Sequence, residues 1–276
     1  MEILLGGISA LFYGVADFLG GEGAKRAPAA SVVLWAGVIS FPLLTALALM
    51  VGGEPVLGDF ILGALAGVFG AFGLVALFAG LGRGRAAAVA PVSAALAAVI
   101  PVLVGVIDGE RPSSLAWAGI AVGIPAIMLC SSVADTGGVK AGGLFYGVAA
   151  GVGFGTFTAL IRFTTPESNL LPLIASRGAT MVLIIGIGVF GIWKVVGFGQ
   201  VPKGIVATNG IFDVTANVTL LLALRAGSLA LAAVAAAFYP AVTILMARVV
   251  NAEHLRKRQI VGLVLTLGAL AAIALG

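Results

Sequence analysis

The chain has 276 residues, of which 61% are hydrophobic and only 9% are charged, and its mean hydropathy is +1.20. Ordinary soluble domains are about 45–50% apolar and about 25% charged, so a soluble globular fold is excluded and a polytopic membrane protein is predicted. The pI of about 9.6 does not indicate nucleic-acid binding, because the basic residues are spread over short loops. A single cysteine, Cys130, and a single histidine, His254, provide no cluster typical of a metal centre.

Ten segments are long and apolar enough to cross a bilayer, which takes about 20 residues of helix. Short connections rich in charged and turn residues separate them. The predicted spans are residues 2–21, 30–51, 58–81, 86–107, 113–133, 141–163, 170–194, 203–224, 228–250 and 258–276. Because every connection is short, the sequence predicts an all-α polytopic membrane protein of ten transmembrane helices with no soluble domain.

The second part of the chain repeats the first. Residues 81–126 align without gaps onto residues 224–269, at an offset of 143, and this alignment pairs Glu110 with Glu253. The run FYGVA at residues 12–16 recurs letter for letter 133 residues later. A gapless match of this length favours a true duplication over chance similarity between two segments rich in alanine and glycine.

Each repeat holds five predicted helices. Because five is odd, the second copy enters the membrane from the side opposite to the first. Inverted repeats of this kind are common in secondary transporters, whose substrate sites lie near the membrane midplane between the repeats. We therefore predict two inverted five-helix units, residues 1–134 and residues 135–276.

Two short motifs recur in both halves. Each half begins with a Tyr-Gly step and carries a glutamate-containing loop before its last helix, followed nine residues after the glutamate by a glycine. The motifs are Tyr13-Gly14 and Tyr146-Gly147, Gly109-Glu110-Arg111 and Ala252-Glu253-His254, and Gly119 and Gly262. Together with the two five-helix halves, they resemble the drug/metabolite transporter superfamily in its ten-helix EamA-domain form.

The resemblance to this superfamily implies a transporter of small metabolites, an exporter in many members, and not an enzyme. It also implies an arginine early in the second helix of a half. Arg177 fits that place in the second half, whereas the second helix of the first half contains no arginine. The site is therefore expected to be asymmetric.

The segment 203–224 carries Asp213 between Asn209 and Asn217. A carboxylate at the bilayer centre costs roughly 2.5–3.5 kcal/mol on insertion scales, so it normally faces a partner or a watery cavity. At about 100° per residue, the three side chains form a stripe about 80° wide and about 12 Å long. We predict that this stripe lines a translocation cavity; the alternative is that it joins helices by hydrogen bonds. The opposite side carries three threonines, which are expected to bond their own backbone: Thr208, Thr215 and Thr219.

Five further residues complete the predicted substrate site: Arg177, Asp17, Tyr13, Tyr146 and Thr156. Arg177 has three alternatives, namely a salt bridge to Asp213, a clamp on a substrate carboxylate or phosphate, and snorkelling to the interface. Asp17 either lines the cavity or lies at a wet helix end. The two tyrosines either pack in the core or select a substrate through their hydroxyl groups. Thr156 lies in a glycine-rich run, which predicts a flexible or a closely packed helix.

The sequence thus predicts a secondary transporter that exports a small polar or amphipathic, amino-acid-like metabolite by alternating access. Asp213 and Asn217 would bind its polar groups, such as an ammonium, and Arg177 its anionic end. Protons could couple through Asp213 or Asp17, because burial disfavours a charged carboxyl group. Two alternatives stay open: a flippase for lipids or lipid-linked sugars, and a membrane-embedded enzyme acting on a lipid-linked substrate.

No catalytic set, cofactor or metal site is expected from the sequence. Glu110 and Glu253, in the loops, are expected to cap helices or form structural pairs instead of carrying protons. The expected partners are a small solute and the lipid bilayer of a bacterial-type inner (plasma) membrane. The chain is expected to act as a monomer or a homodimer.

The loop charges are strongly uneven between the two sides of the membrane. With ten helices, ten lysines and arginines fall in the loops on one side and three fall in those on the other. The positive-inside rule places the richer side in the cytoplasm and both termini outside. The family resemblance implies the reverse orientation.

Overall fold

The computed structural model describes residues 1–83, 86–131, 141–251 and 257–275, and all regular secondary structure within them is helical. Residues 84–85, 132–140, 252–256 and 276 are not described. The helices, in chain order, are α1 (Glu2–Ala24), α2 (Ala29–Val51), α3 (Leu57–Gly82), α4 (Ala86–Ile107), α5 (Ser114–Ser131), α6 (Ala141–Arg162), α7 (Leu171–Val189), α8 (Lys203–Ala226), α9 (Leu229–Ala236), α10 (Tyr239–Asn251) and α11 (Lys257–Leu275). Short 3-10 turns at Pro166–Ser168 and Phe198–Gln200 precede α7 and α8.

Six of these helices are long and apolar enough to cross a membrane within the described residues: α1, α2, α3, the Leu144–Arg162 part of α6, α7 and α8. Three shorter apolar stretches lie at Val92–Ile107, Ser114–Ala126 and Leu229–Thr243. Helices suit a bilayer because they satisfy every backbone polar group internally. The prediction of an all-helical, polytopic membrane protein is confirmed at this level.

The ninth predicted span, residues 228–250, is divided into α9 and α10, with Ala237 and Phe238 between them. Pro240 explains where the second helix starts. Its ring fixes φ and removes the backbone N–H, and the first turn of a helix is where both are tolerated. The predicted span 228–250 is therefore not one continuous helix, because Pro240 lies in the first turn of a new one.

The seventh predicted span, residues 170–194, is also shorter in the structure. Helix α7 ends at Val189, and Gly191 follows with φ of 71°. A positive φ is easily adopted only by glycine, so the chain turns out of the helix here. As a result, Trp193 and Lys194 lie in the connection to α8 and not inside a span.

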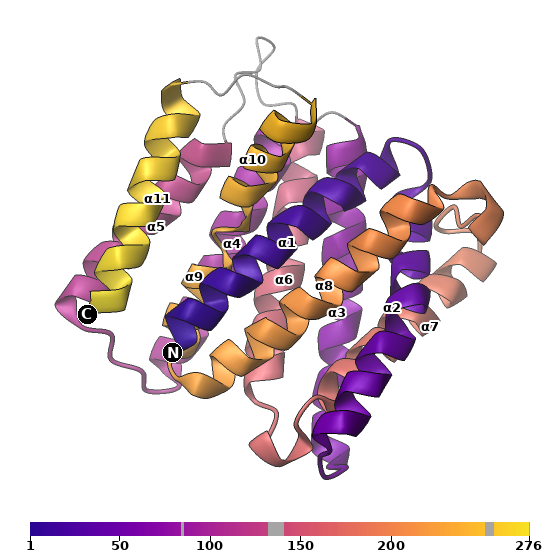
Figure 1. The fold of residues 1–276 in the computed structure, drawn as a ribbon, viewed down its shortest axis with the longest axis horizontal. Coiled ribbons are helices and arrows are strands. Elements are labelled where there is room, and N and C mark those ends of the chain that lie inside the picture. Colours follow the sequence, from indigo (N-terminus) through magenta and orange to yellow (C-terminus); the bar gives the residue numbers. More distant parts are fainter. Residues whose placement is uncertain (84–85, 132–140, 252–256, 276) are drawn as a thin grey trace.

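Helices distant in sequence make the main contacts of the bundle (Figure 1). Helix α1 packs against α8, α9 and α10, while α6 packs against α3 and α4. Helices α5 and α11 pack against each other at one side of the bundle, and both termini lie at the same end of it (Figure 1). The two halves of the chain are thus interleaved.

Two glycines permit close approaches between helix backbones. A Cβ at Gly67 of α3 would collide with the backbone of Ser176 on α7, and one at Gly210 of α8 would collide with the carbonyl of Ala36 on α2. Small residues at helix crossings let backbones approach in this way. Gly67 and Gly210 are also paired in the internal repeat, at the offset of 143.

Candidate functional site

A cavity of about 80 Å³ lies inside the bundle, between helices of both halves. Its wall comes from α1 to α4, from α6 to α9, and from Ala237 and the first residue of α10. None of the described side chains of α5 and α11 lines it. A cavity needs only about 10–15 Å³ to hold one water. The space therefore accommodates several waters or a small polar group.

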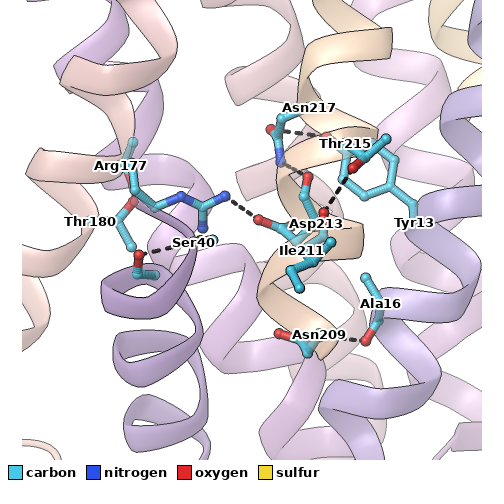
Figure 2. A network of polar contacts seen from close by, with 12 residues as sticks. Tyr13, Ala16, Ser40, Arg177, Thr180, Asn209, Ile211, Asp213, Thr215 and Asn217 are labelled. Atoms are coloured by element: carbon cyan, nitrogen blue, oxygen red, sulfur yellow. Dashed lines mark hydrogen bonds and ion pairs between the residues drawn. The ribbon is translucent and has the colours of Figure 1, made fainter. Parts of the chain in front are cut away.

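An ion pair crosses the cavity wall. Arg177 of α7 binds the carboxylate of Asp213 of α8 through Nη2 and Oδ2, and both residues line the cavity (Figure 2). They are 8% and 5% exposed. Of the three alternatives for Arg177, the structure shows the salt bridge. Since desolvated charges are costly unless they are paired and hydrogen-bonded, each residue stabilises the charge of the other.

A second contact links α8 to α1. The Tyr13 hydroxyl donates to Oδ1 of Asn217 at 3.1 Å, and Nδ2 of Asn217 donates to the backbone carbonyl of Asp213 at 2.7 Å (Figure 2). Both Tyr13 and Asn217 line the cavity. A tyrosine hydroxyl and a carboxamide side by side can donate to and accept from a bound solute.

Asp17 stands one turn beyond Tyr13 on α1 and lines the same cavity. It is 5% exposed. Within the described part of the chain, no group donates a hydrogen bond to its carboxylate or pairs with it. A buried carboxyl group without donors is costly when charged, so Asp17 is the group in this cavity with the strongest need for a ligand or a proton.

Asn209 is brought to a different place. Its Nδ2 donates to the carbonyl of Ala16 on α1 at 2.6 Å, it is 2% exposed, and it is absent from the cavity wall (Figure 2). The Asn–Asp–Asn stripe is therefore divided: Asp213 and Asn217 face the cavity, while Asn209 joins α8 to α1. Thr215 and Thr219 bond the carbonyls of Ile211 and Thr215, both at 2.9 Å, as predicted.

Helix α6 presents Thr158 to the cavity and not Thr156. Side chains two residues apart on a helix point in directions about 200° apart, so only one of the two threonines can face the cavity. Tyr146 also lies elsewhere. It lines a separate hollow, where the guanidinium of Arg83 stands 5.3 Å from the centre of its ring.

Besides Thr158, three polar residues of the cavity wall were missing from the predicted site: Ser176, Thr180 and Tyr239. The Thr180 hydroxyl donates to the Gly67 carbonyl at 2.9 Å, and the Tyr239 hydroxyl lies 3.2 Å from Ser93 Oγ. Ser176 and Thr180 could have been found, because they lie one residue before and one turn after Arg177. Tyr239 has no such signal, since its position depends on the break before α10.

Glu110 caps a helix, as expected. Its carboxylate accepts hydrogen bonds from the Leu229 N–H at 2.5 Å, the Ala230 N–H at 3.1 Å and the Ser228 hydroxyl at 2.7 Å. These groups form the N-terminus of α9, where N–H groups lack intrahelical partners. Glu253 and His254 lie outside the described residues.

The apolar helices define a polytopic integral membrane protein. Residues 1–132 match the EamA-like transporter family. This part of the chain is therefore an EamA-like transporter family domain, which indicates a transporter of the drug/metabolite type. The resemblance noted from the sequence is confirmed.

The comparison with solved structures covers nearly the whole chain. A protein described only as "Crystal structure of protein" is similar over 99% of this chain and 96% of its own, with a TM-score of 0.73 and 19% identity. At this level of identity the similarity concerns the fold. No curated protein matches the sequence.

Proposed function

We propose that the protein is a secondary transporter that exports a small, polar or amphipathic, amino-acid-like metabolite by alternating access. The carrying observation is the cavity, which is lined from both halves of the chain and holds the buried charged groups Asp17, Arg177 and Asp213. Charged groups inside a membrane bundle typically mark a substrate or ion pathway. The small volume of the cavity favours a small solute over a lipid or a lipid-linked sugar.

The packing supports two inverted halves, residues 1–134 and 135–276. Helix α1 packs on α8 as α6 packs on α3, which is the exchange expected if α1 corresponds to α6 and α3 to α8. The close approach of Gly67 to Ser176 has its counterpart in that of Gly210 to Ala36. Alternating access would then proceed by movement of one half against the other around the cavity. The boundary between the halves falls outside the described residues.

The same correspondence makes the ion pair a property of the second half alone. Since Gly67 corresponds to Gly210, Gly70 corresponds to Asp213. Since Ala36 corresponds to Ser176, Gly37 corresponds to Arg177. Two glycines thus stand where the second half has two charges. A Cβ atom added to Gly37 would lie 3.4 Å from Cδ of Arg177, so the Arg177 side chain lies directly beside this glycine. The first half leaves room for charged groups that the second half supplies.

The ion pair favours a zwitterionic substrate. A solute that carries only one charge would leave Arg177 or Asp213 without a partner, and an unpaired buried charge is strongly unfavourable. An amino-acid-like solute can replace one ion pair by two, with its carboxylate on the Arg177 guanidinium and its ammonium on Asp213. Tyr13 and Asn217 would orient it.

Asp17 is our candidate for proton coupling, in preference to Asp213. The charge of Asp213 is already balanced by Arg177, whereas the carboxyl group of Asp17 has no partner among the described residues. A proton on Asp17 would neutralise it without disturbing the ion pair. Proton coupling, the bacterial-type inner membrane and a cytoplasmic location for the basic end of the bundle are all parts of this proposal.

Counterflow in proteoliposomes tests the zwitterion. Vesicles loaded with unlabelled amino acid should take up the labelled compound, whereas the corresponding amines and carboxylic acids should neither be taken up nor compete well. The double variant Arg177→Gln, Asp213→Asn removes both charges but keeps two polar side chains, and it should lose at least about ten-fold in transport rate. Thr215→Val, on the same helix with its hydroxyl bonded to its own backbone, is the matched control. Equal competition by amines, acids and zwitterions would contradict the proposal.

A further inference from the structure

A second hollow, of about 490 Å³, lies at one end of the bundle. Its two cations are Arg83, after the end of α3, and Lys194, between α7 and α8; its two aromatic residues are Tyr146 and Trp193. We call it the basic hollow. Ligand pockets commonly measure about 300–1,000 Å³, so its volume suits a bound group of several atoms.

Small side chains make the basic hollow. The α1–α2 connection and the end of α3 contribute alanines and Gly82 to its wall, and these leave the space open. A Cβ at Gly82 would lie 2.8 Å from the Ala24 carbonyl oxygen, so glycine also holds the end of α3 against the end of α1.

Among the described residues, the two charged ones that line the basic hollow are both cationic. Arg83 and Lys194 are exposed, so a ligand from outside can reach them. The Arg83 guanidinium lies over the Tyr146 ring and donates one hydrogen bond, from Nη1 to the Ala79 carbonyl at 3.1 Å. Its other N–H groups, and the three of Lys194, have no acceptor within the described chain. Glu22, near the end of α1 at this end of the bundle, forms an ion pair with Lys25 at 2.5 Å.

We propose that the basic hollow binds a phosphate-bearing anionic group, with Arg83 and Lys194 on the phosphate oxygens. Arginine suits phosphate because its planar N–H fork matches two oxygens, and lysine adds a point charge. Tyrosine and tryptophan beside cations are typical of the level of lipid headgroups, and basic pockets between membrane helices bind such groups. The phosphate can come from an anionic lipid headgroup or from a soluble phosphate ester.

Thermal unfolding of the full chain in a mild non-ionic detergent tests the site. Phosphatidylglycerol should raise the Tm in a dose-dependent way, while phosphatidylcholine should not. The variant Arg83→Gln, Lys194→Gln should weaken binding about 30-fold. Each cation near a membrane surface contributes a similar free energy of binding to an anionic lipid, and the variant loses two of them. Lys203→Gln is the matched control, because Lys203 also stands over an aromatic ring, that of Phe198, but outside the hollow.

Glycerol phosphate distinguishes the two sources of the group. If it raises the Tm as phosphatidylglycerol does, and the double variant loses both effects, the site binds phosphate esters free in solution as well. If only the lipid acts, acyl chains are required and the ligand is a lipid. The proposal is overturned if neither compound acts, if phosphatidylcholine acts equally, or if the double variant, shown to be folded by gel filtration, responds like the parent protein.

Discussion

Asp59 and Asp17 are both buried acids on apolar helices, yet their surroundings differ completely. Asp59, 3% exposed in the first turn of α3, accepts hydrogen bonds from the Thr165 N–H at 3.0 Å, the Thr165 hydroxyl at 2.6 Å and the Ser168 hydroxyl. Asp17 faces a cavity and accepts none within the described chain. The Asp59 carboxylate is hydrogen-bonded within the fold, whereas the Asp17 carboxylate is available to bind a solute or a proton.

The difference separates structural from functional charges in this protein. Asp59 and Glu110 each join two segments distant in sequence at a helix end, where N–H and O–H donors are available. The cavity holds charged groups near the middle of the bundle, where helices offer no free donors. A carboxylate there needs a partner such as Arg177, a solute or a proton. The contrast predicts how much each residue contributes to stability.

Removal of one partner of the ion pair should have the largest effect on stability. In Arg177→Leu, Asp213 loses the one cation that pairs with it among the described residues, and the free energy of unfolding should fall by about 3–5 kcal/mol. Equilibrium unfolding in mixed micelles measures the change. The double variant Arg177→Leu, Asp213→Leu should recover much of the loss, because no unpaired charge remains. If the double variant is as unstable as the sum of the singles, the pair is not coupled.

Asp59→Ala should have the next largest effect. Three donors lose a charged acceptor, and hydrogen bonds to charged groups contribute roughly 1.5–3 kcal/mol each before compensation by water. Because the alanine variant also removes the cost of burying a carboxylate, we expect a net loss of about 2–3 kcal/mol in the free energy of unfolding. Counterflow per folded molecule should not change. A selective loss of transport at unchanged stability would place Asp59 in the functional group.

Glu110→Ala should cost about 1 kcal/mol, the usual contribution of a helix cap. The loss is smaller than for Asp59 because Ser228 stays as N-cap of α9 and accepts from the Leu231 N–H at 3.2 Å. Thermal unfolding of Glu110→Ala beside Glu110→Gln gives the measurement, since glutamine keeps an acceptor and should lose less. If both variants match the parent protein, the cap contributes nothing.

Much of the fold was predictable because lipid simplifies the pattern. Spans of about 20 apolar residues are visible directly in the sequence, and their helical structure follows from backbone hydrogen bonding. The break between α9 and α10 was not predictable in the same way. Residues 229–237 are uniformly apolar, so composition gives no sign of the place where the helix ends. Only the proline at residue 240 indicated an irregularity, and its place in the helix depends on packing.

The site residues were predictable where a charged or strongly polar side chain stood inside an apolar span. Asp213, Asn217, Asp17 and Arg177 are unusual inside a membrane, and the structure brings all four to one cavity. Asn209 lies on the same stripe of α8 but meets the Ala16 carbonyl, because the neighbouring helix stands there. The periodicity of the stripe predicted which side of α8 carries the polar residues. It could not predict which neighbouring helix or cavity each of them would meet. Tyr146 lies away from the cavity, although the repeat pairs it with Tyr13.

Asp17→Asn should have the smallest effect on stability and a large effect on coupling. Because no described group donates to the carboxylate, its replacement by a neutral amide should change the free energy of unfolding by less than about 1 kcal/mol, and the removal of an unpaired buried charge favours a gain. Uptake driven by a pH gradient should be abolished if Asp17 carries the proton. Counterflow, which needs no net proton movement, should persist.

The two readouts of Asp17→Asn must separate for the comparison to hold. Asp59→Asn is the matched control, since it makes the same chemical change at an acid with three donors and should lower stability while leaving proton-driven uptake per folded molecule intact. If Asp17→Asn keeps full pH-driven uptake, the proton passes elsewhere. If Asp17→Asn lowers the free energy of unfolding as much as Asp59→Asn does, the Asp17 carboxylate is structural. A carboxylate without hydrogen-bond donors should contribute little to stability.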